Sequence, residues 1–180
     1  MMRKSLVFVA IATLLSTAAC GGSSTPLVTG QIVPCISIAT IDNPNQVINT
    51  DCLDTSKGVN VAAIKGPAIV NVWGSWCEPC KRELPFFTEF YQTMDPQIQL
   101  IGIDVEEKRI EDGRMFARTH GIMWPNLYDA EGVTRSHFGM GVPVTWFIDS
   151  DGKVLYKKIG PFESTEELRV MTFKYFGLRG

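Results

Sequence analysis

Two cysteines, Cys77 and Cys80, stand three residues apart between an apolar run and a segment with helical periodicity. The run, residues 68–73, is rich in β-branched side chains and has the length of a buried parallel strand. If a helix begins at Cys77, its sulfur lies among unpaired backbone N–H groups at the positive end of the helix dipole, which favours thiolate over thiol. One helical turn would bring Cys80 to the same face with the Cα atoms about 5 Å apart, inside the range of roughly 4.4–6.8 Å that a disulfide needs. The spacing therefore predicts a reversible dithiol/disulfide pair and thiol–disulfide exchange chemistry.

The first 19 residues have the pattern of a signal peptide and are not expected to belong to the fold. Arg3 and Lys4 form a short positive region, and residues 6–15 form an apolar core that is too short to cross a bilayer of about 30 Å. Small residues then lead to Cys20, and the whole segment resembles a bacterial lipoprotein signal. The resemblance implies that Cys20 is lipidated and becomes the mature N-terminus, held by acyl chains that are sufficient for stable anchoring.

The expected location is extracytoplasmic, on the bacterial cell membrane. Thr17 stands where a lipoprotein signal usually has Leu, so ordinary secretion with cleavage near Ala19 stays an alternative. Residues 20–30 begin with the lipidated cysteine and continue as a polar, flexible tether, and residues 31–180 form one folded domain. The net charge of −2 and the absence of a basic tract give no indication of nucleic-acid binding.

Export would place the five cysteines where disulfides persist. With Cys20 assigned to lipid and Cys77 to Cys80, the remaining pair is Cys35 with Cys52. A disulfide between them would close a loop of about seventeen residues and stabilise the fold by about 3 kcal/mol in the chain-entropy model. The alternative is two free thiols, each buried separately.

The rest of the chain alternates strand and helix patterns, with Ser150-Asp151-Gly152 as a hairpin signal. We expect an α/β domain with mixed strand order and an N-terminal β extension. Expected strands cover residues 28–38 (as an edge strand or extended lead-in), 58–61, 68–73, 98–104, 126–129, 144–149 and 153–157. Expected helices cover residues 77–91, 106–120, 131–138 and a last segment from Ser164, which has capping-box spacing to Glu167, up to Gly177.

Three segments together resemble the thioredoxin superfamily: residues 73–80 (Trp-Gly-Ser-Trp-Cys-Glu-Pro-Cys), residues 141–145 (Gly-Val-Pro-Val-Thr) and the hairpin at residues 149–154. Residues 81–85, residues 104–129 and the tether are similar to the TlpA/ResA branch of membrane-tethered extracytoplasmic proteins. The resemblance covers residues 56–176. It implies a thioredoxin fold, a central mixed β-sheet flanked by helices, and a disulfide reductase that often acts on apocytochrome c before haem attachment. It implies no cofactor.

The resemblance also assigns roles to individual residues. Cys77 would be the exposed nucleophile, and Cys80 the resolving thiol. Pro143 matches the family's cis-proline, and the backbone of Val142 before it would pair with an extended substrate. Trp76, next to the nucleophile, is expected to cover the dithiol and to contact partner chains. The mechanism this implies is attack by the Cys77 thiolate on a partner disulfide, followed by release of the partner through attack by Cys80.

Glu83 matches an acid that this branch keeps near the dithiol. On a helix it lies one turn beyond Cys80, where it would shift the thiol pKa values or relay a proton. Thioredoxin itself has a buried Asp six residues before its first cysteine, whereas this chain has Asn71, which cannot exchange a proton. Any acid–base role therefore falls to Glu83 or to solvent. The alternative is that Glu83 is an ordinary solvated helix residue.

Other functions are weighed against this hypothesis. A zinc site is disfavoured because the chain has no second Cys-x-x-Cys, and a peroxiredoxin-type peroxidase because Gly74 stands where Thr is wanted. The charged run at residues 104–112 is interpreted as a solvated loop and helix start, with substrate selection as the alternative. A disulfide-forming oxidase would use the same cysteines, and a non-catalytic binding module would use the same groove. The expected partners are secreted proteins with disulfides or thiols, apocytochrome c among them, and a membrane electron donor.

Overall fold

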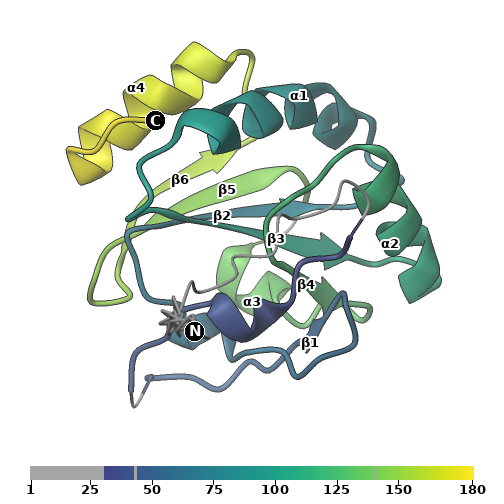
Figure 1. Ribbon diagram of the computed structural model, residues 1–180. Coiled ribbons are helices and arrows are strands. Elements are labelled where there is room, and N and C mark those ends of the chain that lie inside the picture. The colour runs from purple at the N-terminus through teal and green to yellow at the C-terminus, as the bar shows by residue number, and fades with distance from the viewer. Residues whose placement is uncertain (1–30, 43, 140) are drawn as a thin grey trace, which may run out of the picture.

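A six-stranded mixed β-sheet forms the centre of the molecule (Figure 1). The computed structural model describes residues 31–180 except 43 and 140. Within these residues no helix is long and apolar enough to span a bilayer. The signal segment, Cys20 and the rest of the predicted tether, residues 1–30, lie outside the described residues. The strands are β1 (Asp51–Cys52), β2 (Ala68–Trp73), β3 (Gln99–Val105), β4 (Asn126–Asp129), β5 (Val144–Ile148) and β6 (Val154–Ile159), and the helices are α1 (Glu78–Thr93), α2 (Ile110–Thr119), α3 (Arg135–Phe138) and α4 (Thr165–Phe176), with 3₁₀ turns η1 (Cys35–Ser37) and η2 (Val61–Ala63).

The strand order is β1-β4-β3-β2-β5-β6, with β2, β3 and β4 parallel and the other pairings antiparallel. Every residue of β2 is buried, as expected for a central strand that is covered on both faces. Because β2 and β3 are in register, Trp73 pairs with Asp104 at the carboxyl end of the sheet, where α1 begins. The predicted α/β fold with mixed strand order is confirmed.

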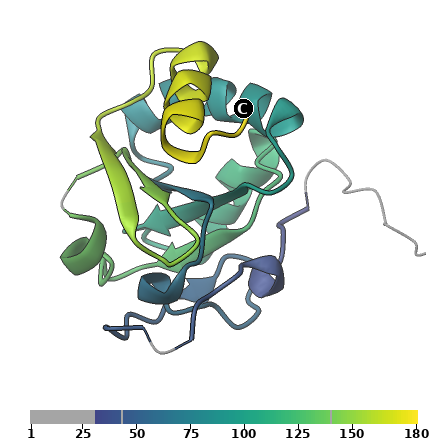
Figure 2. The ribbon, with the colours of Figure 1, turned by 90° about the vertical axis from the view of Figure 1, so that its left-hand side faces the viewer.

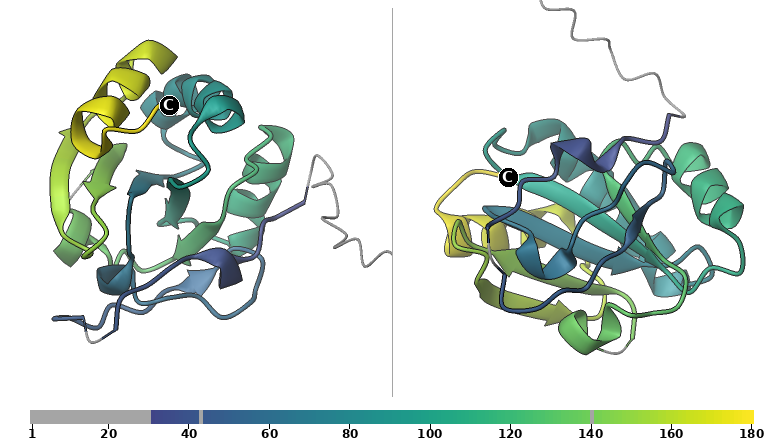
Figure 3. Two further views of the ribbon diagram at one scale, coloured as in Figure 1. Left: turned by 60° about the vertical axis from the view of Figure 1, so that its left-hand side comes forward. Right: turned by 90° about the horizontal axis from the view of Figure 1, so that it is seen from below.

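Helices and loops cover both faces of the sheet (Figures 2 and 3). On one face, α1, α2 and α4 pack over side chains that include Ile69, Trp73 and Phe147. On the other, α3, η1 and η2 cover a second cluster that includes Val70 and Val72. Strand alternation assigns every second residue to each face, so the face under α1 and α2 also carries the polar residues of β2 and β3 at the active-site end.

The N-terminal segment differs from the expectation. Residues 35–37 form the 3₁₀ turn η1 instead of a strand, and residues 58–61 provide one isolated β-bridge at Asn60, followed by η2. The side chain of Asn60 accepts a hydrogen bond from the backbone N–H of Ala62 and so favours a turn there. The β extension is the two-residue strand β1, which pairs antiparallel with β4.

A disulfide joins Cys35 to Cys52, with a Cα–Cα distance of 5.9 Å. Both residues are buried in the cluster on the face opposite α1. The disulfide therefore attaches η1 to β1 at the edge of the sheet, and the alternative of two separate free thiols is wrong.

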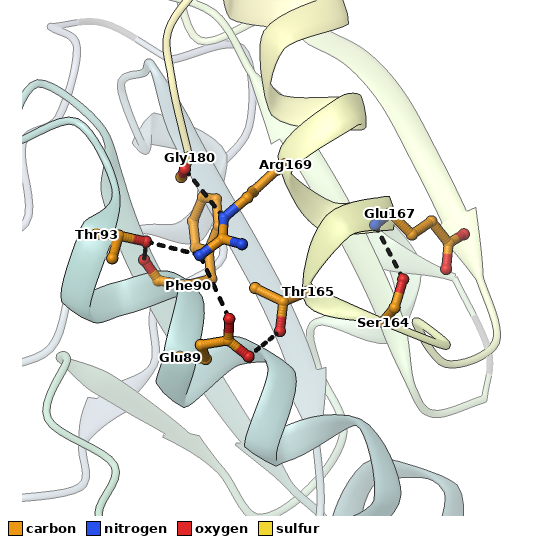
Figure 4. Close-up of polar contacts among 8 residues, drawn as sticks. All are labelled: Glu89, Phe90, Thr93, Ser164, Thr165, Glu167, Arg169 and Gly180. Atoms are coloured by element: carbon orange, nitrogen blue, oxygen red, sulfur yellow. Dashed lines mark hydrogen bonds and ion pairs between the residues drawn. The ribbon is translucent and has the colours of Figure 1, made fainter.

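Helix α4 is fixed to α1 by a polar cluster (Figure 4). Glu89 on α1 accepts hydrogen bonds from Thr165 Oγ1 at 2.7 Å and from Arg169 Nη2 at 3.4 Å. The predicted capping box is present in part: Ser164 Oγ accepts from the N–H of Glu167 at 3.1 Å, while the Glu167 carboxylate accepts from Glu163 N instead of Ser164 N. These contacts hold α4 over the second half of α1 and leave the first turn of α1 to the redox pair.

Candidate active site

The first turn of α1 carries a disulfide between Cys77 and Cys80, with an S–S distance of 2.04 Å and a Cα–Cα distance of 5.3 Å. Cys77 is the N-cap of α1, and its Sγ accepts a hydrogen bond from the backbone N–H of Cys80 at 3.2 Å. Pro79, in the first turn, has no N–H to offer, so the Cys80 N–H is the donor aimed at this sulfur. When Cys77 is reduced, the same donor and the helix dipole stabilise its thiolate.

The structure buries both sulfur-bearing residues, since Cys77 is 3% exposed and Cys80 is 4% exposed. The expectation of an exposed nucleophile is therefore wrong for the disulfide form. Both cysteines belong to the apolar cluster around Trp73 on the α1 face of the sheet, which covers most of their surface. A partner has access to a small part of Cys77 only, so the side chains beside it control approach.

Trp76 is the exposed aromatic side chain next to the pair, with half of its surface open to solvent. Its Nε1 donates to the carbonyl oxygen of Val105 at 3.2 Å, which places the indole across the end of β3. Gly74 makes this possible, because a Cβ there would lie 2.7 Å from Trp76 Nε1. A cavity of about 230 Å³ lies between Trp76 and Val142. The Val142–Pro143 peptide bond is cis, as the resemblance implied.

Glu83 is buried on the first turns of α1, with 1% of its surface exposed. Its Oε1 accepts a hydrogen bond from Asn71 Nδ2 at 2.9 Å, and its Oε2 accepts from the backbone N–H of Phe162 at 2.9 Å. Burial raises the pKa of this carboxyl to about 7, and the two donors and the Lys158 ammonium offset only part of the effect. The interpretation of Glu83 as a solvated helix residue is wrong.

Asn71 extends this polar site to β5. Its Nδ2 also donates to Thr145 Oγ1 at 3.1 Å, so one amide connects the acid on α1 with the residue two positions after Pro143. Sequence reasoning missed Thr145, although a Thr in an otherwise apolar strand is a signal that a buried partner exists.

The charged run at residues 104–112 contains two buried acids, and its interpretation as a solvated loop is wrong for both. Asp104 is fully buried and Glu107 is 7% exposed, while α2 begins only at Ile110. The Glu107 carboxylate accepts hydrogen bonds from Ser75 N at 2.5 Å and from Ser75 Oγ at 2.9 Å. Donors 32 residues away in sequence therefore explain its burial. Asp112 remains at the surface, where it pairs with Arg109.

The site consists of a disulfide at a helix N-terminus, a buried acid on the same helix and the exposed aromatic side chain of Trp76. Within the described residues, no group of three or more Cys, His, Asp or Glu side chains is placed to hold a metal ion. The fold and this pair define a thioredoxin-like thiol–disulfide oxidoreductase. Residues 44–157 match the model of the AhpC/TSA family, and the chain belongs to this family.

Curated relatives agree with this class, and solved structures share its fold. The chain is 32% identical to the thiol-disulfide oxidoreductase ResA of Bacillus thuringiensis strain Al Hakam over 127 residues, which is 69% of this chain and 70% of the relative. StoA from Bacillus subtilis has a similar fold, with a TM-score of 0.58 and 23% identity over 68% of this chain and 93% of StoA. A secreted Mycobacterium tuberculosis disulfide oxidoreductase is also similar, with a TM-score of 0.61 and 20% identity over 71% of this chain and 95% of that chain.

Proposed function

We propose that the protein is a membrane-tethered, extracytoplasmic reductase of protein disulfides that acts through Cys77 and Cys80 and that accepts apocytochrome c as one substrate. The observation that carries the proposal is the buried acid Glu83 on the same helix as the dithiol, with a pKa that burial raises to about 7. The proposal is supported by the electrostatics around Cys77 and Cys80, by the class of the protein's relatives and by the sequence pattern of its N-terminus.

The reaction proceeds in two exchange steps. The Cys77 thiolate attacks one sulfur of the partner disulfide, forms a mixed disulfide and releases the other partner sulfur as thiolate. Cys80 then loses its proton and attacks Cys77 Sγ, which closes the Cys77–Cys80 disulfide and releases the second partner thiolate. The partner gains two electrons and two protons, and the protein dithiol loses the same number. Glu83, one turn beyond Cys80, is the group available to accept the Cys80 proton.

The direction of electron flow follows from how weakly the reduced form is stabilised. A strongly oxidising dithiol needs a thiolate that is stabilised well beyond the helix dipole. Here Glu78, between the cysteines, pairs with Lys81 at 2.6 Å, so this pair adds no net charge next to the sulfurs. Above its pKa of about 7 Glu83 adds a negative charge, which disfavours a nearby thiolate. The site therefore favours loss of electrons to a partner.

The reduction potential tests this direction. Equilibration with glutathione buffers should give about −250 mV or lower, near the value of about −270 mV known for thioredoxin and far from about −120 mV for a strongly oxidising dithiol. Glu83→Gln should raise the potential, because it removes the charge that opposes the thiolate. A value above about −180 mV would contradict the proposal and support the oxidase alternative.

Substrate choice is tested with two synthetic peptide disulfides, one with the Cys-x-x-Cys-His pattern of an apocytochrome c and one with the histidine replaced. The reduced protein should reduce both, and faster reduction of the first supports a role in cytochrome c maturation, while equal rates argue for a general reductase. Cys80→Ala should accumulate the mixed disulfide, and Cys77→Ala is the matched control that should accumulate none. A protein that turns over neither peptide would be the non-catalytic binding module.

Membrane tethering is tested at Cys20. Labelling with palmitate and inhibition of processing by globomycin should both depend on this cysteine, and Cys20→Ala should release the protein from the membrane. A Cys20→Ala protein that stays fully membrane-bound would contradict the lipid anchor. Release of the unaltered protein into the medium would support ordinary secretion instead.

A further inference from the structure

Asp104 is a fully buried acid at the active-site end of β3. Neither of its carboxyl oxygens has a hydrogen-bond donor among the described residues. The fold nevertheless makes room for it, because a Cβ on Gly113 of α2 would lie 1.7 Å from Asp104 Oδ2. A side chain that occupies prepared space without a donor is suited to hold its own proton, since a neutral carboxylic acid can act as the donor itself.

The carboxyl of Glu107 interacts with the carboxyl of Asp104. Burial, the Glu107 charge and the hydrogen bond to Glu107 raise the pKa of Asp104 to about 9, and the charge of Asp112 acts in the same direction. Tyr128 faces Asp104 from β4, and its own pKa is raised by burial and by these acids. A pKa of about 9 keeps Asp104 protonated at neutral pH, which leaves it a proton to offer to the Glu107 carboxylate.

Glu107 acts on the segment that enters the redox pair. Its two oxygens hold the backbone N–H and the hydroxyl of Ser75, two residues before Cys77. Between them stands Trp76, whose indole lies on Gly74 and donates to Val105. Ser75, Trp76 and Glu107 also line a groove of about 430 Å³ beside the site.

We propose that Asp104 is a positioning residue of the thiol–disulfide reaction: as a hydrogen-bond donor it fixes the Glu107 carboxylate that holds Ser75, and through Ser75 it sets the position of Trp76 and Cys77. Loss of its proton leaves two carboxylates side by side, and their repulsion releases Ser75. The resulting control is independent of Glu83, which reaches the pair from the other end through α1. It acts on the established oxidoreductase chemistry and holds for either direction of electron flow.

The direct test is a pH titration of the oxidised protein, in which Cys77 and Cys80 have no thiol to titrate. Carbon-detected NMR of the ¹³C,¹⁵N-labelled protein follows the Asp104 carboxyl carbon and the Ser75 amide nitrogen from about pH 6 to about pH 10. Because the two signals are read residue by residue, tyrosines and lysines, which titrate at about pH 10 and above, do not obscure them. Both signals should change together with a midpoint at about 9.

Two variants test whether the ionisation of Asp104 causes the change at Ser75. Asp104→Asn keeps a donor to Glu107 but cannot ionise, so the Ser75 transition should disappear. Asp112→Asn removes an acid of the same cluster at the surface and should keep the transition. A Ser75 nitrogen that does not follow Asp104, or an Asp104 that is already ionised at pH 6, overturns the proposal. If Asp104→Asn does not fold, Glu107→Gln replaces it: the Asp104 midpoint should then fall, and an unchanged midpoint overturns the proposal.

A kinetic measurement distinguishes positioning from a purely structural role. Reduction of the oxidised protein by dithiothreitol at pH 7 should be about two- to tenfold slower in Asp104→Ala, the loss expected for one hydrogen bond that places a reacting group. Asp104→Asn should restore the rate to within about twofold of the unaltered protein, because its amide donates in place of the acid. Equal rates for Asp104→Ala and the unaltered protein overturn the proposal. Because dithiothreitol is the only partner, this result does not depend on the proposed protein substrates.

Discussion

Replacing Glu83 with Gln should abolish a specific pH dependence of folding stability. The pKa of Glu83 is about 7 in the folded protein, against 4.5 for the free side chain. The folded state therefore binds the proton more tightly, and its stability falls as the pH rises from 4.5 to about 7, after which it stays level. At 1.36 kcal/mol for each pKa unit, the loss is about 3 kcal/mol. Gln is neutral at every pH, so the variant should not show this loss.

The hydrogen bonds of Glu83 allow this substitution without an unpaired buried group. In the Glu83→Gln variant, the amide oxygen can accept from the N–H of Phe162, as Glu83 Oε2 does. The amide nitrogen then faces Asn71, whose side chain needs only to flip so that its oxygen accepts from the new amide and from the Thr145 hydroxyl. The difference in stability between the two proteins therefore reports the charge of Glu83 and not a lost hydrogen bond.

The assay is urea unfolding of both oxidised proteins at several pH values between about 4 and 8, read as the difference in unfolding free energy. That difference should grow in favour of the Gln variant by about 3 kcal/mol across the range. Glu131→Gln, at an exposed position away from the site, reports the background effect of the substitution. A Glu83→Gln difference that does not vary with pH would refute the reasoning, because it would show that burial does not raise the Glu83 pKa.

Three further predictions concern the surroundings of the site. Replacing Cys35 and Cys52 with Ala should lower the unfolding free energy by about 3 kcal/mol, measured by urea unfolding, because the disulfide closes a loop with a sequence separation of 17. Asp129→Ala should cost about 3 kcal/mol in the same assay, since its buried carboxylate accepts from the N–H groups of residues 133 and 134 and from a hydroxyl. Gly113→Ala should destabilise by about 1–3 kcal/mol because its Cβ would overlap Asp104, whereas a gain of about 1 kcal/mol, normal for Gly→Ala in a helix, would contradict the close approach.

The sequence predicts the central part of the fold because its signals are local. The strand at residues 68–73, the pair Cys77 and Cys80 and the following helix each follow from periodicity or spacing within a few residues. The two-residue strand β1 has no period to detect, and its pairing with β4 joins segments about 75 residues apart, so sequence patterns do not predict it. In the 28–38 segment, an extended pattern with Pro34 does not distinguish a strand from the turn η1.

The acids of the site show a similar limit. Resemblance predicts that Glu83 matters, but its burial depends on donors at Asn71 and Phe162, far from it in the chain. Asp104 and Glu107 lie in a run of charges, for which a solvated surface is the ordinary interpretation. Their burial depends on space at Gly113 and on donors at Ser75. Both conditions come from tertiary packing, which a one-dimensional charge pattern does not contain.

The buried acids Glu83 and Asp104 imply that the exchange rate has two separate pH-dependent components. Glu83 changes charge at about pH 7 and acts through α1, while Asp104 changes charge at about pH 9 and acts through Glu107 and Ser75. Among the described residues they share no hydrogen-bond partner, so the effects of Glu83→Gln and Asp104→Asn on the logarithm of the rate should add. Each single variant should remove one component, and the double variant both, which leaves only the titration of the thiols. An interaction energy between the two substitutions larger than about 0.5 kcal/mol would show instead that the two acids form one network through the dithiol. In that case neither acid has a separate role in moving the two protons that accompany the two electrons, because the pair titrates as a unit.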